Sequence, residues 1–214
     1  MPFTIEQFME LFRMYNLAVW PAQLIFYLVA FTAVFLAIKR FSFSGRVISV
    51  LLALFWLWMA IAYHFAYFAV INKIAIVFGL FFIAQALIFI SRGAIDQRIS
   101  FAYVNGTRGL IGLALILFSL VIYPFMSNAA GHNFPYSPTF GLPCPTVMFT
   151  LGMLLLSDAG PGFFVIPLLW SLLSGFAAWR LGMTEDVSLV IAALITVTIL
   201  YTGARRQLVK NSPS

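Results

Sequence analysis

Long apolar runs are the feature that most constrains what this chain can fold into. Of its 214 residues, 63% are hydrophobic and 8% are charged, and the mean hydropathy is +1.04. Soluble domains carry about 25% charged residues, so this chain has too few to cover a water-facing surface. Because apolar runs of about 18 residues or more indicate transmembrane helices, we expect an all-α integral membrane protein. A β-barrel would instead show short alternating segments.

Seven apolar segments are candidate membrane crossings. Their expected bounds are 21–38, 47–71, 74–91, 109–126, 146–156, 163–179 and 187–203. The fifth is short, because about eleven residues rise only roughly 16 Å as a helix, against a hydrocarbon core of about 30 Å. A re-entrant hairpin is one interpretation. We favour a broken crossing, in which "FGLPCP" enters as non-helical chain and the helix begins at Pro145 or Thr146.

Basic residues predict the orientation. Three clusters follow the first, third and seventh segments: Lys39, Arg40 and Arg46; Arg92, Arg98 and Arg108; and Arg205, Arg206 and Lys210. Short loops rich in lysine and arginine stay cytoplasmic, and the three clusters share one side only with seven crossings. We therefore expect the N-terminus outside and the C-terminus in the cytoplasm. Since helix ends account for the net charge of +6, we expect no nucleic-acid partner.

Three regions are expected along the chain. Residues 1–17 form an interfacial amphipathic helix, in which Thr4 and Gln7 have the spacing of a capping box. These residues lack the basic start and short apolar core of a cleavable signal peptide. Residues 18–204 form the seven-helix transmembrane domain, and residues 205–214 form a basic cytoplasmic tail.

The stretch "GHNFPYSPTFGLPCPT", residues 131–146, holds one of two histidines, the only cysteine and four of ten prolines. With seven crossings, His64, His132 and Cys144 all fall in the outer half of the protein. Imidazole and thiolate are good ligands for copper and zinc, so these three side chains are candidate metal ligands. The alternative is structural, with the histidines as hydrogen-bonded packing residues and the cysteine as a small hydrophobe.

The expected site is an outward-facing pocket without catalytic residues, because ionisable groups are scarce within the spans. Its expected residues are His64, Tyr67, His132, Asn133, Tyr136, Thr139, Cys144 and Thr146. Glu185 and Asp186 open the last helix, where carboxylates suit the positive end of the helix dipole. They could also attract cations, but the dipole alone explains them.

Three functions fit these features. The first is binding or transport of a small solute or soft metal ion. The second is a structural or assembly subunit of a larger membrane complex. The third is an electron carrier holding haem or quinone against the aromatic residues around His64. The expected cofactors are accordingly a soft metal ion (copper or zinc) or haem. The expected partners are the lipid bilayer, other membrane proteins or a second copy of the chain. An enzyme is not favoured.

Three segments carry a resemblance to a known family: "YNLAVWPAQ", "LLALFWLWMAIAYH" and "GHNFPYSPTFGLPCPTVMFTLGMLLL". Together they resemble an uncharacterised family of bacterial multi-pass membrane proteins, a domain of unknown function, over nearly the whole chain. The resemblance implies a location in the bacterial inner membrane. It implies no activity and no catalytic residues.

Overall fold

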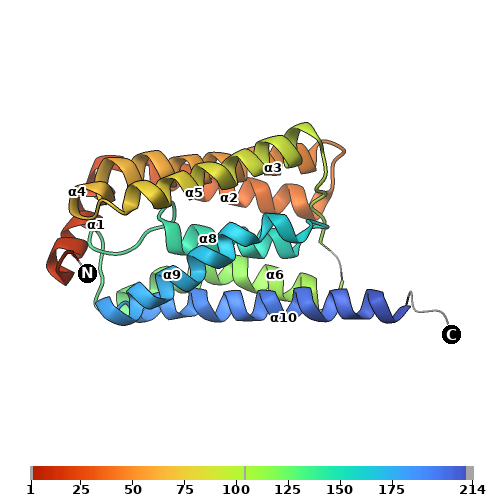
Figure 1. Ribbon diagram of the computed structural model, residues 1–214. Helices are drawn as coiled ribbons and strands as arrows, with labels where there is room; N and C mark the ends of the chain where they lie inside the picture. Colours follow the sequence, from red (N-terminus) through yellow and green to blue (C-terminus); the bar gives the residue numbers. More distant parts are fainter. Residues whose placement is uncertain (1, 104, 211–214) are drawn as a thin grey trace.

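The computed structural model describes residues 2–103 and 105–210, and it shows long helices running side by side in a bundle (Figure 1). The α-helices are α1 (Ile5–Val19), α2 (Ala22–Lys39), α3 (Ser44–Trp58), α4 (Ala69–Ile71), α5 (Ala75–Ile88), α6 (Thr107–Leu117), α7 (Tyr123–Ala129), α8 (Pro143–Leu155), α9 (Val165–Leu181) and α10 (Val187–Lys210). Three π-helical segments continue these helices: η1 (Met59–Phe68), η2 (Phe89–Ile95) and η3 (Phe118–Ile122). Two short 3-10 turns are η4 (Pro161–Phe163) and η5 (Thr184–Asp186).

Among the described residues, six helical stretches are long and apolar enough to cross a membrane: Ala22–Lys39, Ser44–Ile71, Ala75–Ile95, Thr107–Ala129, Pro161–Leu181 and Val187–Arg205. They correspond to six of the seven expected segments. The fifth expected segment is the shorter apolar helix α8. Helix α10 continues to Lys210, so part of the expected tail is helical. Residues 211–214, and the side chains of Arg206 and Lys210, lie outside what the structure describes.

Helix α1 lies at one end of the bundle, which we call the α1 end (Figure 1). The expected capping box is present: the Thr4 hydroxyl accepts from the Gln7 N–H, and the Gln7 side chain accepts from the Thr4 N–H. One face of α1 is buried through Leu11, Phe12 and Tyr15. This burial places α1 against η1 rather than free of the bundle.

Helix α8 is the central element of the bundle, and all of its residues except Cys144 are buried. It packs against α6, α9 and α10. Contact with α6 is close because two glycines face each other: a Cβ on Gly152 would lie 2.8 Å from the carbonyl oxygen of Gly112. A fully buried helix needs apolar or small residues on every side, which explains why its sequence shows no polar face.

Non-helical chain precedes α8, as the sequence predicts, but the helix begins at Pro143 rather than at Pro145 or Thr146. A proline fits the first helical turn because its missing N–H would have no partner there. Gly141 has a φ of +103°, and a Cβ at this position would lie 2.4 Å from the Phe26 ring. The approach to α8 therefore requires glycine both for its backbone and for the space beside α2.

The chain passes from one end of the bundle to the other through α8. Before the helix, the Asn16 side-chain amide of α1 donates to the carbonyls of Pro135 and Ser137, at 2.7 and 2.8 Å. After the helix, the Asp158 N–H donates to the Ser100 carbonyl at 3.2 Å. Segment 157–158 thus lies with the loop between η2 and α6, at the end of the bundle opposite α1.

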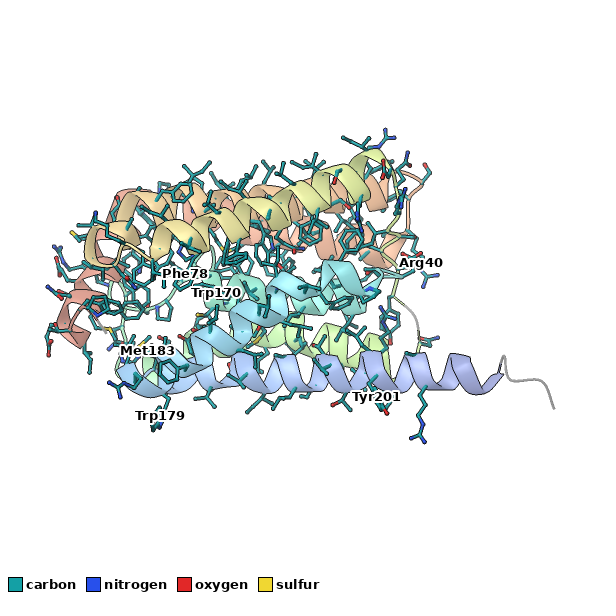
Figure 2. The ribbon with its side chains drawn as sticks, in the orientation of Figure 1. Arg40, Phe78, Trp170, Trp179, Met183 and Tyr201 are labelled. Carbon is teal, nitrogen blue, oxygen red and sulfur yellow. The ribbon has the colours of Figure 1, made fainter. Side chains whose placement is uncertain are left out.

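That opposite end, which we call the basic end, also carries Arg40 (Figure 2). Helix ends and loops there supply most of the described cations: Lys39, Arg40, Arg46, Arg92, Arg98, Arg108 and Arg205. Arg108 terminates α8, because its guanidinium donates to the carbonyls of Leu155 and Ser157 at 3.1 and 2.7 Å. A cation at a helix C-terminus is favourable in the helix dipole.

The glycine contact between α6 and α8 predicts different effects for the same substitution at two helical glycines. Gly152→Ala should lower the melting temperature in detergent, because overpacking costs about 1–3 kcal/mol. Gly203→Ala is the matched control, since nothing lies within 4 Å of a Cβ there. It should leave the melting temperature unchanged or raise it, because alanine favours a helix by up to about 1 kcal/mol over glycine. Equal shifts in the two variants would contradict the close packing.

Candidate ligand cavity

A cavity of about 380 Å³ opens among α1, η1, α5 and α9 at the α1 end. Figure 2 labels Phe78, Trp170 and Met183 of its wall, all toward this end of the bundle. Aromatic side chains from four elements and from Phe3 make up much of the lining: Phe3, Phe8, Phe12, Tyr63, Phe68, Phe78, Trp170 and Phe176. The cavity is therefore mainly apolar.

The first half of α1 closes one side of the cavity. The Phe3 ring packs edge-on against Phe68 of η1, with centroids 5.7 Å apart. The Phe8 ring packs against the same Phe68 ring, with centroids 6.1 Å apart. The Phe12 ring lies next to Phe8, with centroids 4.6 Å apart. The amphipathic face of α1 is thus turned into the bundle, where it becomes part of the cavity wall.

A small polar group interrupts this apolar lining, and it consists of Cys144, Ser174 and Asp186. The buried Asp186 carboxylate accepts a hydrogen bond from the Tyr123 hydroxyl of α7. The Cys144 thiol contacts the same carboxylate, with Ser174 beside it. Three elements therefore meet at one carboxylate, namely α7, α8 and η5, and α9 contributes Ser174 beside the thiol.

Glu185 lies next to Asp186 but has a different partner. Its side chain is fully buried, and one oxygen pairs with His132 Nδ1 at 2.8 Å. The other oxygen has no hydrogen-bond partner among the described residues. His132 can balance the charge of Glu185 when it is protonated, whereas the partners of Asp186 are neutral donors.

Burial raises the pKa of Asp186 from 3.8 to about 6. Hydrogen bonds from Tyr123 and Cys144 lower this pKa, and the negative charge of Glu185 raises it. The carboxylate is therefore ionised at neutral pH and becomes protonated as the pH falls through about 6. Because this pKa is higher in the folded state than in the unfolded chain, ionisation of Asp186 destabilises the fold. The free energy of unfolding contributed by this group therefore falls as the pH rises from 3.8 to about 6.

The predicted metal site of His64, His132 and Cys144 is not found. Within residues 2–103 and 105–210, no three His, Cys, Asp or Glu side chains are grouped so that they could hold a metal ion. His64 is fully buried, and its ring lies against Trp170 and Phe82, with centroids at 5.2 and 4.6 Å. Neither ring nitrogen has a partner in the described part of the chain. Cys144 lines the cavity, whereas aromatic packing surrounds His64.

Two of the expected pocket residues hold the non-helical chain instead. The Thr139 hydroxyl donates to the Asn16 side chain at 2.7 Å. The buried Thr146 hydroxyl accepts from the Gly141 N–H at 3.0 Å. These bonds satisfy polar groups in an apolar setting, so the two threonines have a structural role here.

Three other expected residues lie away from the described lining of the cavity. Tyr67 packs edge-on against Tyr15, with centroids 5.6 Å apart. Asn133 and Tyr136 are exposed in the chain before α8. Sequence composition alone does not show which polar residues of η1 and of the chain before α8 line the cavity and which lie outside it.

Sequence reasoning did not place Asp186 in the candidate site, nor Tyr123, Ser174 and Trp170. Asp186 precedes an apolar helix, and a carboxylate at that position normally faces water. Its position just before a membrane-spanning segment was the available signal. Only the packing of α7, α8 and α9 around it shows that it is buried.

The three segments that carry the family resemblance meet in the structure. The Trp58 indole N–H donates to the Tyr15 hydroxyl at 2.6 Å, and Asn16 binds the chain before α8. Apolar helices of membrane-spanning length define the class of the protein as helical and multi-pass. The chain belongs to the family of unknown function DUF6064, whose model matches residues 5–211. No curated protein and no solved structure matches the chain.

The cavity predicts how its single cysteine reacts. N-ethylmaleimide should modify Cys144 in the reconstituted protein, because the side chain is partly exposed in the cavity. Ala177→Trp, on the cavity wall, should slow the reaction about tenfold or more by blocking access. Ala66→Trp, on an exposed position of η1, is the matched control and should leave the rate unchanged. Intact-protein mass spectrometry follows the reaction. Equal slowing by both variants would argue against access through this cavity.

Proposed function

We propose that this protein lies in a bacterial inner membrane and binds a small, largely apolar solute in its outward-facing cavity. The observation that carries the proposal is the cavity of about 380 Å³, lined mainly by aromatic and aliphatic side chains and including the polar group of Cys144, Ser174 and Asp186. Small-molecule sites have volumes of about 300–1,000 Å³ and combine apolar walls with a few polar groups. The aromatic lining supports an apolar body for the solute, and the polar group supports one oriented end.

A seven-crossing topology supports the outward orientation. The non-helical chain before α8 and the helix itself together lead from the α1 end to the basic end. With α8 as the fifth crossing, the three basic clusters share one side, which the positive-inside rule makes cytoplasmic. The α1 end and its cavity then face outward. Non-helical backbone at membrane depth is tolerated where protein covers it, and Phe140 and Leu142 are buried.

Cysteine labelling in intact cells tests this orientation. In a Cys144→Ser background, Asn133→Cys lies at the α1 end, and Ser42→Cys lies at the basic end. Both positions are exposed. A membrane-impermeant maleimide should label Asn133→Cys in whole cells and Ser42→Cys only after lysis. The reverse pattern would overturn the orientation, and labelling of both in whole cells would contradict the seven-crossing path.

Binding of a neutral apolar probe tests the function itself. N-phenyl-1-naphthylamine should bind the protein in nanodiscs saturably, at one site per chain, after subtraction of the signal from empty nanodiscs. Ala177→Trp should weaken the affinity about tenfold or more by filling the cavity. Ala66→Trp should bind like the native protein.

The comparison between these variants separates the cavity from the lipid. Probe that merely partitions into the bilayer gives a non-saturating signal that is equal for all three proteins. That result would overturn the proposed function.

A further inference from the structure

The charge balance of the cavity points to the kind of solute that it binds. Asp186 is the one charged side chain at neutral pH among the described residues that line the cavity. It is 6% exposed. Among the described residues it makes no ion pair with lysine, arginine or histidine. An ionised carboxylate in an apolar cavity is costly unless a cation balances it.

The hydrogen bonds of Asp186 do not remove this imbalance. Tyr123 and Cys144 contribute neutral donors, which stabilise the carboxylate without cancelling its charge. The one nearby imidazole, His132, is already bonded to Glu185 at 2.8 Å. Glu185 and Asp186 therefore have one potential cation between them, His132. It pairs with Glu185, and Asp186, which lines the cavity, is left without an ion-pair partner among the described residues.

The aromatic walls favour the same sign of charge. The faces of aromatic rings carry negative potential and attract ammonium groups within about 6 Å. Rings from α1, η1, α5 and α9 line the same cavity as the carboxylate: Phe8, Phe12, Tyr63, Phe68, Phe78 and Trp170. A cavity that combines one carboxylate with several aromatic rings suits an organic ammonium better than a bare metal ion, which needs several oxygen, nitrogen or sulfur ligands.

We propose that the cavity selects a small lipophilic cation, an amine or quaternary ammonium whose charged end lies at Asp186 and whose apolar body lies among the aromatic rings. This inference rests on the proposed function, because it names the class of solute that the same cavity holds. An anionic solute of the same shape is excluded by repulsion from the carboxylate. A neutral lipid chain would fill the apolar part but leave the charge unbalanced.

Cys144 lies beside Asp186 and reports the charge preference directly. The test compares a cationic reagent, trimethylammonium-ethyl methanethiosulfonate, with the anionic sulfonato-ethyl analogue. Each rate of Cys144 modification is divided by the rate of the same reagent with free mercaptoethanol. The native protein should favour the cationic reagent about tenfold or more, because one unit charge acts at short range in a poorly hydrated space.

Asp186→Asn should abolish this preference, because it removes the charge and keeps the shape of the side chain. Asp158→Asn is the matched control. Asp158 binds the Ser100 N–H at the basic end, so this variant changes the net charge equally and should retain the preference. Phenyltrimethylammonium should also slow modification of Cys144 by N-ethylmaleimide in the native protein and not in Asp186→Asn.

A pH series on the native protein keeps the test valid should Asp186→Asn fail to fold. The titratable groups that face Asp186 are Tyr63 of η1, Tyr123 of α7, Cys144 of α8, and Glu185 with His132. Ionisation of Asp186, whose pKa burial raises to about 6, should increase the preference for the cationic reagent between pH 5 and pH 7. Dividing the two rates removes the common effect of thiol ionisation.

Failure of this inference is distinguishable from failure of the proposed function. Equal relative rates for both reagents at pH 7, with saturable binding of the neutral naphthylamine probe, would overturn the cation preference and leave the proposed function intact. A preference that persists undiminished in Asp186→Asn would also overturn it. Loss of saturable probe binding would overturn the proposed function itself.

Discussion

The structure depends on satisfying the backbone of the non-helical chain before α8 in apolar surroundings. A peptide group without a hydrogen bond costs several kcal/mol in hydrocarbon, so such chain persists only where protein supplies partners. Asn16 binds two of its carbonyls, and Thr146 binds the Gly141 N–H. These bonds fix α1 to the start of α8. They therefore hold α1, whose first half closes one side of the cavity, close to Cys144 at the start of α8.

Much of the fold follows from the sequence because hydropathy and capping act locally. The six long helices, the capping box of Thr4 and the short fifth helix were all predictable from runs and spacings. The π-helical segments were not, because no local pattern marks them. The start of α8 at Pro143 lies two or three residues before the predicted start at Pro145 or Thr146, because Pro143 and Pro145 both suit a first helical turn and the sequence does not distinguish them.

The candidate site was predictable only in part, because it is assembled from distant segments. The proline-rich stretch predicted Cys144 as a site residue, and Cys144 lines the cavity. It could not show that His64 would be enclosed by Trp170 and Phe82 rather than by ligands. Asp186 has a sufficient local explanation at a helix start, so its burial beside Tyr123 was visible only once the helices were packed together.

The clamp of Arg108 on the last carbonyls of α8 determines how this helix can move. Two of these bonds, to Leu155 and Ser157, anchor the C-terminal tip of α8 at the basic end to one guanidinium. Axial sliding would break charge-assisted bonds, whereas rocking about the anchored tip would preserve them. Under such rocking the displacement grows along the helix and is greatest at Cys144. The end of α8 that would move furthest therefore lines the cavity, so a small tilt of the helix would change the width of the cavity.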